Sequence, residues 1–188
     1  SVGASYGYIY LRSEYPLAKY FLTEAIQNLK SKNLLGKNIL GKNFTFDIEL
    51  RIGAGSYVCG EETAMMESIE GKRGLVRSKP PLPAIKGLFS KPTLINNVIT
   101  LASMSAILLQ GKEIFSQFGS GKSLGTMPYQ LCGNIKQGGL IEVPFGITLN
   151  EIIYDFGAGT LNDKPVHAVQ IGGPLGIYLP AHLFNTPL

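Results

Sequence analysis

The sequence of 188 residues contains no tryptophan, only two cysteines, only two histidines and no long apolar run. Cys59 and Cys132 do not form a CxxC unit, so this chain alone cannot build a zinc site or an iron–sulfur cluster. His167 and His182 have no partners at ligand spacing, and we expect no metal site. The lack of about 20 consecutive apolar residues argues against membrane insertion. With so few cysteines, a reducing compartment is the default, and we expect a cytoplasmic protein.

The start of the chain lacks the usual features of a protein N-terminus. Residues 1–5 contain neither an initiating Met nor the basic and apolar blocks of a signal peptide. We expect the chain to be an internal piece of a longer protein. Hydrophobic residues make up 45% of the sequence and charged residues 16%, a balance that predicts a folded α/β protein rather than a disordered one.

The net charge of +4 raises the question of nucleic-acid binding, because basic domains attract phosphate groups. Much of the positive charge falls in one stretch that is interleaved with Pro and Gly and lacks regularly spaced aromatic residues for base stacking. Its basic residues are Lys72, Arg73, Arg77, Lys79, Lys86 and Lys91. This pattern favours a small phosphorylated ligand, and we expect no nucleic-acid partner. About half of these side chains are expected to be ordinary solvated residues.

The first 52 residues predict a βαβ unit. Residues 7–12 are rich in β-branched and aromatic side chains, as strands are. Ser13 is the expected N-cap of a helix whose apolar residues recur at helical spacing as far as Leu29, and this apolar face is expected to pack on a sheet. Residues 44–52 alternate between apolar and polar side chains, which predicts a second strand.

The following segment has the order strand, glycine turn, helix. The second strand continues into Gly53 and Gly55, and residues 61–69 predict a helix that ends at Gly71. Glycines let the backbone approach a ligand, and the free N–H groups of a helix start attract anions. This order is therefore typical of a ligand-binding site.

Two further segments complete the first part of the chain. Residues 72–92 carry four prolines and predict a long irregular loop, which in compact domains is usually functional or disordered. Residues 98–109 then predict an amphipathic core helix that ends at Gly111. Residues 119–123 have the composition of a linker. We therefore predict two domains, residues 1–122 and residues 123–188.

The second predicted domain is small. Residues 127–134 and 140–143 predict a hairpin with its turn at Gly138 and Gly139. Thr148 and Glu151 match a capping box at the start of a short helix that ends at Gly157, and a further strand is predicted at residues 167–171. This order predicts an α+β domain of the β-grasp, ubiquitin-like type.

Two nucleotide-binding motifs are excluded by their spacing. Residues 119–123 contain Gly-Lys-Ser, but Ser116 stands where a P-loop requires glycine, and a predicted helix precedes it instead of a strand. The third glycine of the set Gly53, Gly55 and Gly60 comes too late for the dinucleotide fingerprint. These glycines alone indicate only a tight turn.

Two adjacent acids, Glu61 and Glu62, begin the second predicted helix, where the helix macrodipole favours negative charge. Their setting, GAGSYVCGEETAMMESIEGKRG, continues through SKPPLPAIKGLFSKPTLINNVITLA. This long block resembles the flavin-binding half of the family of the 51-kilodalton-type subunit of respiratory NADH dehydrogenase. The family also includes the diaphorase subunits of NAD-reducing hydrogenase and formate dehydrogenase.

Later segments extend this resemblance. The stretches GTMPYQLCGNIKQGGLIEVPFGITLNEIIYDFGAGT and AVQIGGPLGIYLP resemble the soluble-ligand-binding β-grasp domain that follows in the family. The resemblance implies part of a Rossmann-like FMN-binding α/β domain over residues 1–122 and a β-grasp domain over residues 123–188. Within the family, the sequence most resembles formate dehydrogenase β subunits.

The resemblance also implies a surface that binds FMN and NAD. Its expected residues are Gly53, Tyr57, Gly60, Glu61, Glu62, Lys79, Ile95, Asn96, Asn97 and Thr100. Tyr57, Gly60 and the two acids are expected along the isoalloxazine ring, and the two asparagines on the ribityl phosphate side. Glu62 is expected to be catalytic, next to the flavin and the nicotinamide, and Lys79 to lie near the dinucleotide phosphates. Leu82 departs from the family, whose respiratory members often have there an aromatic residue that stacks on adenine.

The implied chemistry is hydride transfer between nicotinamide and FMN, followed by passage of single electrons to iron–sulfur clusters. A [4Fe-4S] cluster is expected in the full-length subunit but not in this segment. The expected partners are a thioredoxin-like [2Fe-2S] subunit and a catalytic formate dehydrogenase or hydrogenase subunit. The family's glycine-rich FMN loop is not in this chain, so we expect the segment alone to be inactive. The alternative is a non-catalytic fragment whose β-grasp part binds a ligand or a partner protein.

Overall fold

The computed structural model describes residues 2–188, which form two compact units divided between Asn96 and Asn97. Each unit is described by itself. Among the described residues, no helix has both the length and the apolar character needed to cross a membrane. The mixed α/β class is confirmed, whereas the predicted domain boundary after residue 122 stays a prediction.

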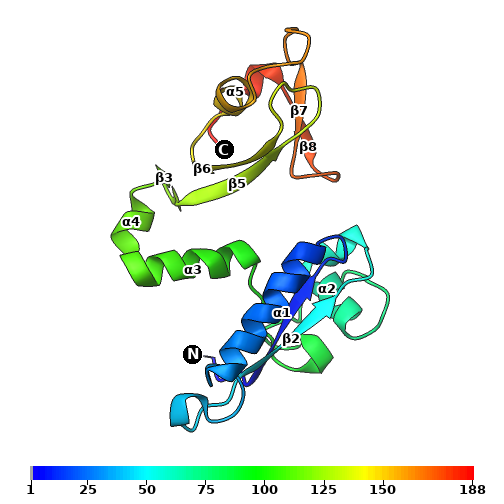
Figure 1. The fold of residues 1–188 in the computed structure, drawn as a ribbon. Helices are drawn as coiled ribbons and strands as arrows, with labels where there is room; N and C mark the ends of the chain where they lie inside the picture. The colour runs from blue at the N-terminus through cyan, green and yellow to red at the C-terminus, as the bar shows by residue number, and fades with distance from the viewer. Residues whose placement is uncertain (1) are drawn as a thin grey trace. The chain divides into compact units, whose positions relative to one another are not determined.

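The first unit is built on a βαβ motif, as the sequence predicts (Figure 1). Strand β1 (Tyr6–Leu11) pairs in parallel with β2 (Asp47–Ile52), with Tyr6 opposite Asp47 and Leu11 opposite Ile52. Helix α1 (Pro16–Ser31) connects the two strands, together with the 3-10 turn η1 (Ile39–Gly41). Both strands therefore end at the same edge of the sheet.

Helix α1 begins three residues later than the predicted N-cap, so the prediction for Ser13 is wrong. Tyr15 is the N-cap residue, without a side-chain cap, and Pro16 takes the first helical position. The fixed φ angle of proline suits that position, and its missing N–H would have no helical acceptor there anyway. The face that packs towards the sheet is only half-buried, at Ala18, Leu22 and Ile26.

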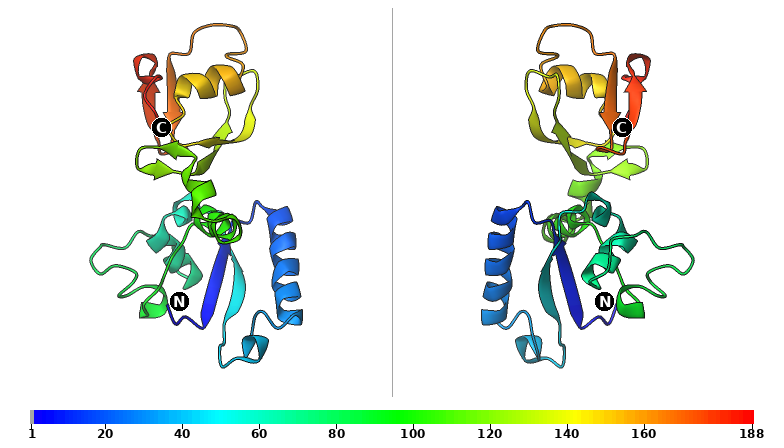
Figure 2. Two further views of the ribbon diagram at one scale, coloured as in Figure 1. Left: turned by 90° about the vertical axis from the view of Figure 1, so that its left-hand side faces the viewer. Right: turned by 90° about the vertical axis from the view of Figure 1, so that its right-hand side faces the viewer.

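The first unit has three layers (Figure 2). Helix α1 lies on one face of the strand pair, and α2 (Glu62–Ile69) lies on the other face. The hydroxyl groups of Tyr10 on β1 and Ser68 on α2 are 2.9 Å apart, which ties the second layer to the third. The buried residues of this unit include Ala64 and Met66 of α2 and Cys59 just before it.

Residues 72–92 form the irregular loop that the sequence predicts, with only a 3-10 turn, η3 (Leu88–Ser90), near its end. The loop is braced internally, because the N–H of Thr93 donates to the carbonyl of Pro83 at 2.9 Å and the N–H of Leu88 donates to the Thr93 hydroxyl at 2.8 Å. Leu88 is buried. The loop is thus irregular but internally bonded.

The second unit begins with α3 (Val98–Gln110) and α4 (Lys112–Ser116). The prediction that α3 is an amphipathic core helix is wrong within the described structure, because none of its residues is buried and Leu108 and Leu109 are 80% and 85% exposed. Apolar residues occur on all sides of this helix, so no single face defines an inside. The predicted linker at residues 119–123 instead forms a small antiparallel hairpin, β3 (Gly119–Ser120) with β4 (Ser123–Leu124).

The rest of the second unit has two hairpins and one helix. Strand β5 (Thr126–Leu131) pairs with β6 (Gly139–Pro144), and β7 (Ala168–Ile171) pairs with β8 (Ile177–Pro180). The helix α5 (Leu149–Glu151) continues as the π-helical turn η4 (Ile152–Phe156), and a 3-10 turn, η5 (Ala181–Leu183), follows β8. The predicted final strand is therefore one half of a hairpin.

The helix and the second hairpin of the second unit share one small core. Leu149, Ile153 and Phe184 are buried together, with Val169 and Leu179 of the second hairpin packed against them. The predicted capping box is confirmed, because Thr148 accepts from the N–H of Glu151 and the Glu151 carboxylate accepts from the N–H of Thr148. The loop between β5 and β6 spans residues 132–138, so the turn is longer than the predicted Gly138-Gly139 pair.

Candidate functional site

The candidate site of the first unit lies where its two parallel strands end. After β1 the chain passes to Arg12, and after β2 it passes to Gly53, whose N–H donates to the carbonyl of Leu11 at 2.8 Å. In open α/β sheets, ligands bind outside the carboxyl ends of the strands. The connection from Gly53 to α2 is therefore the part of this unit to search for binding residues.

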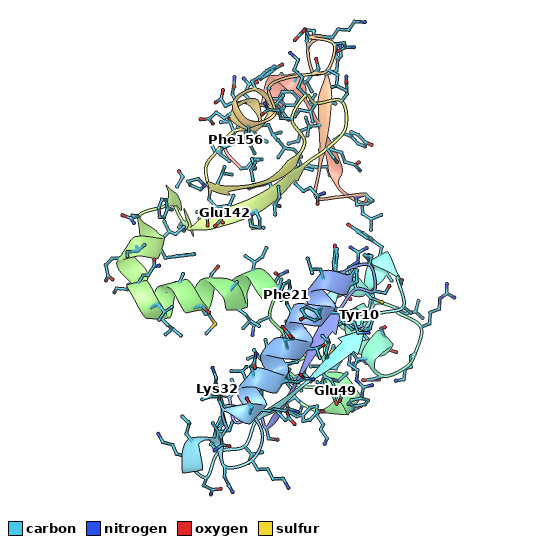
Figure 3. All side chains as sticks on the ribbon, viewed as in Figure 1. Tyr10, Phe21, Lys32, Glu49, Glu142 and Phe156 are labelled. Carbon is cyan, nitrogen blue, oxygen red and sulfur yellow. The ribbon has the colours of Figure 1, made fainter. Side chains whose placement is uncertain are left out.

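Gly53 is required by its neighbour Tyr10, which is labelled in Figure 3. A Cβ atom at position 53 would lie 2.5 Å from the Tyr10 hydroxyl and 2.8 Å from the ring carbon that bears it. Burial raises the pKa of Tyr10, although the hydrogen bond to Ser68 acts in the opposite direction. The expected ligand-binding role of Gly53 stays a prediction, and the structure gives this glycine a packing role.

Gly60, by contrast, faces open space. Apart from its own residue and its two chain neighbours, no atom lies within 4 Å of the position that a Cβ would take there, and its φ angle is not positive. The 3-10 turn η2 (Tyr57–Gly60) leads to this position, and Tyr57 is 47% exposed. The guanidinium group of Arg12 lies 5.6 Å from the centre of the Tyr57 ring, within cation–π range. A bare backbone next to an exposed aromatic ring fits a flat ligand such as the flavin ring.

Glu61 is the N-cap of α2, whereas the sequence predicts it as the first residue of the helix. Its Oε2 atom accepts from the N–H groups of Thr63 and Ala64, both at 2.8 Å, and from the Thr63 hydroxyl at 2.5 Å. Burial alone would raise the pKa of this carboxyl, but the bonds from Thr63 and Ala64 outweigh it and lower the pKa. The signal in the sequence was an acid directly before a helical run, although glutamate is not among the preferred cap residues.

Glu62 and Lys79 form an ion pair at the same end of α2. The Lys79 ammonium group donates a hydrogen bond to Glu62 Oε1 and lies 3.7 Å from Glu61 Oε1. The hydrogen bond to Glu62 is the main cause of the raised pKa of Lys79. Both side chains remain more than a third exposed, so a ligand can reach them. The structure thus brings together three predicted site residues, Glu61, Glu62 and Lys79.

Arg77 has a different role from the one that the basic stretch suggests. Its guanidinium group donates to Glu67 at 2.5 Å, to Glu70 at 2.9 Å and to the Gly87 carbonyl at 3.0 Å. Lys72 also pairs with Glu70, at 2.7 Å. Both cations therefore already have acidic partners on α2 and at its C-terminal end, and Arg77 is the more shielded of the two, with 25% of its side chain exposed against 60% for Lys72.

This charged cluster lines a pocket of about 310 Å³ in the first unit. Its lining includes Thr63, Glu67, Glu70, Arg77, Pro81 and Lys86. Glu70 is the most buried of the paired acids, with 8% of its side chain exposed, and its pKa is about 2. Burial alone would raise the pKa of Glu70, but hydrogen bonds from Lys72, Arg77 and the Phe89 N–H together outweigh burial and lower it. The pocket wall thus contains an ion-pair network of Glu67, Glu70, Lys72 and Arg77, and Lys86 adds a further positive charge.

The remaining predicted site residues lie where the two units meet in the sequence. Ile95 and Asn96 end the first unit, and Asn97 and Thr100 belong to the second. The Asn97 side chain caps α3 by accepting from the N–H of Ile99 at 2.9 Å. Thr100 lies in the first turn of α3 and is exposed. A binding role for these four residues stays a prediction.

Residues 2–188 contain no group of three or more His, Cys, Asp and Glu side chains that could hold a metal ion. Cys59 is buried and Cys132 is exposed. Neither histidine belongs to a candidate metal group in the described part of the chain.

Comparison with known proteins identifies the family of this chain. Residues 1–106 match the Nuo51 FMN-binding domain. The chain is 51% identical over 176 residues to the NADP-reducing hydrogenase subunit HndC of Solidesulfovibrio fructosivorans, a match that covers 94% of this chain and 36% of that protein. It is 45% identical over 182 residues to an NADH-quinone oxidoreductase subunit of Escherichia coli, covering 97% of this chain and 41% of that protein.

A solved structure agrees with these relatives. The crystal structure of NAD⁺-reducing [NiFe]-hydrogenase in the H₂-reduced state has a chain that matches 99% of this one, with a TM-score of 0.83 and 36% identity, over 31% of its own length. The chain thus spans well under half of each of these proteins. The match to the Nuo51 domain covers more than half of this chain, and the chain belongs to the Nuo51 FMN-binding domain family.

Proposed function

We propose that this chain forms part of the FMN- and NAD(H)-binding region of an oxidoreductase subunit that passes electrons between nicotinamide and iron–sulfur clusters. The observation that carries the proposal is the meeting of Glu61, Glu62 and Lys79 at the start of α2. Gly60, directly before them in the chain, has an open backbone. Membership of the Nuo51 FMN-binding domain family supports FMN as the cofactor.

The residues of the site have separate roles in this proposal. The exposed ring of Tyr57 and the bare backbone of Gly60 form a flat contact for the isoalloxazine ring. Glu62 accepts a hydrogen bond from the nicotinamide carboxamide and fixes the orientation of the nicotinamide. Lys79 contacts a phosphate oxygen of the dinucleotide, for which its fixed positive charge is suited. Bound FMN supplies the chemistry, because it accepts a hydride and releases single electrons.

The ion pair between Glu62 and Lys79 has a consequence for binding. Both side chains already have a partner within the chain, so a dinucleotide must share or replace that contact. Since the pair is exposed, water and salt screen it, and little free energy is needed to separate it. Charge-assisted contacts to phosphate and carboxamide can offset that cost.

We further propose that the subunit belongs to a cytoplasmic formate dehydrogenase, with a thioredoxin-like [2Fe-2S] subunit and a catalytic subunit as partners. The support is the resemblance of the sequence to formate dehydrogenase β subunits. The relatives compared above are hydrogenase and NADH-quinone oxidoreductase subunits, and these are the competing assignments. Formate-dependent reduction of NAD⁺ by the purified complex distinguishes them, and reduction with hydrogen alone would contradict the formate assignment.

We also propose that residues 123–188 are a β-grasp domain of the soluble-ligand-binding type. The support is the presence of two hairpins and one capped helix, with the helix and the second hairpin packed around a core of Leu149, Ile153 and Phe184. In this proposal the domain serves as a docking element for another subunit. Deleting this domain is expected to prevent assembly of the complex while the subunit keeps its flavin. An intact complex would contradict the docking role.

The central experiment uses the full-length subunit. Purified protein is expected to show flavin absorbance that NADH bleaches, and Glu62→Gln is expected to lower the bleaching rate about tenfold or more by weakening a charge-assisted hydrogen bond. Arg51→Gln is the control, because Arg51 forms its ion pair with Glu49 on β2. A colourless protein that does not bind added FMN would overturn the proposal.

A further inference from the structure

The loop of residues 72–92 carries Lys79, yet only part of it is held by regular structure. Lys79 itself is 37% exposed, and its ammonium group pairs with the two acids at the start of α2. An exposed ion pair holds a long side chain weakly, because it is screened by water and opposed by side-chain entropy. Something other than this pair must therefore set the position from which Lys79 extends.

Arg77, two residues earlier in the loop, fixes the position from which Lys79 extends. Its side chain bonds to two acids of the α2 region, Glu67 and Glu70, and to the carbonyl of Gly87 in the far part of the loop. One side chain thus connects the helix with both halves of the loop. The three donors point in different directions, which only the planar guanidinium fork of arginine can provide.

The backbone of Arg77 is fixed as well. Its N–H donates to the hydroxyl of Thr63 at 2.9 Å, and that hydroxyl donates to Glu61 at 2.5 Å. Thr63 is 1% exposed, so this connection is shielded from water. Position 77 is therefore joined to the same helix start that carries the acids opposite Lys79.

The partners of Arg77 are themselves well held. Only 18% of the Glu67 side chain and 8% of the Glu70 side chain are exposed, against 25% for Arg77. Glu70 also accepts from the N–H of Phe89 at 2.7 Å, which bonds the end of the loop to the same carboxylate. Charge-assisted hydrogen bonds that are partly shielded from water are stronger than exposed ion pairs.

We propose that Arg77 is a positioning residue, which anchors the loop on α2 so that Lys79 is held opposite Glu61 and Glu62. This inference rests on the proposed role of Lys79 in binding the dinucleotide. Arg77 does not touch the ligand, because its guanidinium group is occupied by the two acids and Gly87. Its effect on dinucleotide binding passes through Lys79.

The alternative is that Arg77 only stabilises the fold, and kinetics separate the two roles. In the full-length subunit, Arg77→Gln is expected to raise KM for NADH about tenfold, the size of effect of one lost charge-assisted contact, with kcat and flavin content within about twofold. A purely structural role would instead lower flavin content and the active fraction and leave KM unchanged. Arg77→Lys, which keeps a cation but not the three bonds, is expected to give a smaller rise in KM.

A double-mutant cycle with Lys79→Gln tests whether the effect of Arg77→Gln on KM depends on Lys79. If Arg77 acts through Lys79, Arg77→Gln will add less than about twofold to KM once Lys79 has been replaced. Lys72→Gln is the matched control, because it removes a cation from Glu70 but no bond to residues 77–90, and KM is expected to stay within about twofold.

The outcomes are distinct. Independent, multiplicative effects of the two variants on KM would overturn the positioning role, and so would an unchanged KM in both Arg77 variants. If Arg77→Gln does not fold, the same cycle is run with Arg77→Lys. A wild-type subunit whose flavin NADH does not reduce would instead overturn the proposed function, and this inference with it.

Discussion

The backbone N–H of Arg77 donates to the hydroxyl of Thr63 at 2.9 Å, across 14 residues of sequence. The same hydroxyl donates to Glu61, the N-cap of α2. One buried threonine therefore joins the start of the helix to the loop that carries Lys79. This connection holds the loop at Arg77 against the start of α2, where the proposed site lies.

Thr63→Val is expected to destabilise the chain by about 1–3 kcal/mol, because it leaves the N–H of Arg77 without its acceptor at a partly buried position and removes one donor to Glu61. Urea denaturation followed by circular dichroism measures the free energy of unfolding. Thr63→Ser keeps the hydroxyl and loses only a methyl group, so it is expected to cost about 1 kcal/mol. Equal stability of the valine and serine variants would show that the hydroxyl does not contribute.

Gly53→Ala is expected to destabilise the chain by about 1–3 kcal/mol, because the new methyl group overlaps the Tyr10 hydroxyl. The prediction concerns packing, since the φ angle of Gly53 is not positive. Tyr10→Phe removes the nearest atom, and in that background the cost of Gly53→Ala is expected to fall. The fall will be partial because a ring carbon would still lie 2.8 Å away. Additive costs in the double-mutant cycle would contradict this contact.

Elements with local signals could be predicted from the sequence. The βαβ unit and α2 follow from short-range periodicity, and the capping box of Thr148 and Glu151 is a four-residue pattern. The start of α1 was misplaced because serine at position 13 is a common cap residue, whereas the pre-set φ of Pro16 decided the boundary. Strand β8 was missed because its four residues carry too short a pattern and end in proline.

Contacts that depend on the folding of the loop could not be predicted. The bonds of Arg77 reach residues 7 and 10 positions away, and Lys79 meets Glu62 across 17 residues. No sequence period links such positions, since helical neighbours are three or four residues apart. A basic stretch therefore suggested a ligand, while the folded loop paired three of its cations, Lys72, Arg77 and Lys79, with acids of the α2 region. The resemblance indicated the site residues, whose binding roles stay predictions, and the tertiary structure shows which of their side chains meet.

Glu70 is expected to make stability depend on pH in the acid range. Its pKa is about 2, below the ordinary 4.5, so its contribution is complete above pH 5 and is lost as the pH falls from 4.5 towards 2. The expected loss is on the order of 2 kcal/mol after allowance for solvent screening. Glu70→Gln removes this dependence, so wild type and variant are expected to differ at pH 7 and to converge near pH 2.

Urea denaturation at a series of pH values between 2 and 7 measures this dependence on Glu70. Glu24→Gln on α1 is the control, because the Glu24 carboxylate accepts from Tyr20 at an exposed position. A constant difference between wild type and Glu70→Gln across this pH range would contradict the prediction.

Substitution of Gly60 is expected to weaken FMN binding without affecting folding, whereas substitution of Gly53 is expected to affect folding. A methyl group at position 60 meets no atom within 4 Å and the backbone there is not in the left-handed region, so Gly60→Ala is expected to leave the free energy of unfolding within about 1 kcal/mol of wild type. In the full-length subunit the same methyl group would stand where the flavin ring is proposed to contact the backbone. FMN affinity is therefore expected to fall about tenfold or more, because a well-packed planar ligand cannot move aside without losing its other contacts.

Fluorescence titration of the apo-subunit with FMN measures the affinity of the Gly60→Ala variant. Gly41→Ala is the comparison variant, since Gly41 also faces open space but lies in the turn between α1 and β2, far in sequence from the site. Its positive φ makes any cost of that substitution one of stability rather than of FMN affinity. Unchanged FMN affinity in Gly60→Ala would place the flavin elsewhere, because no ligand can lie against this backbone and be indifferent to an added methyl group.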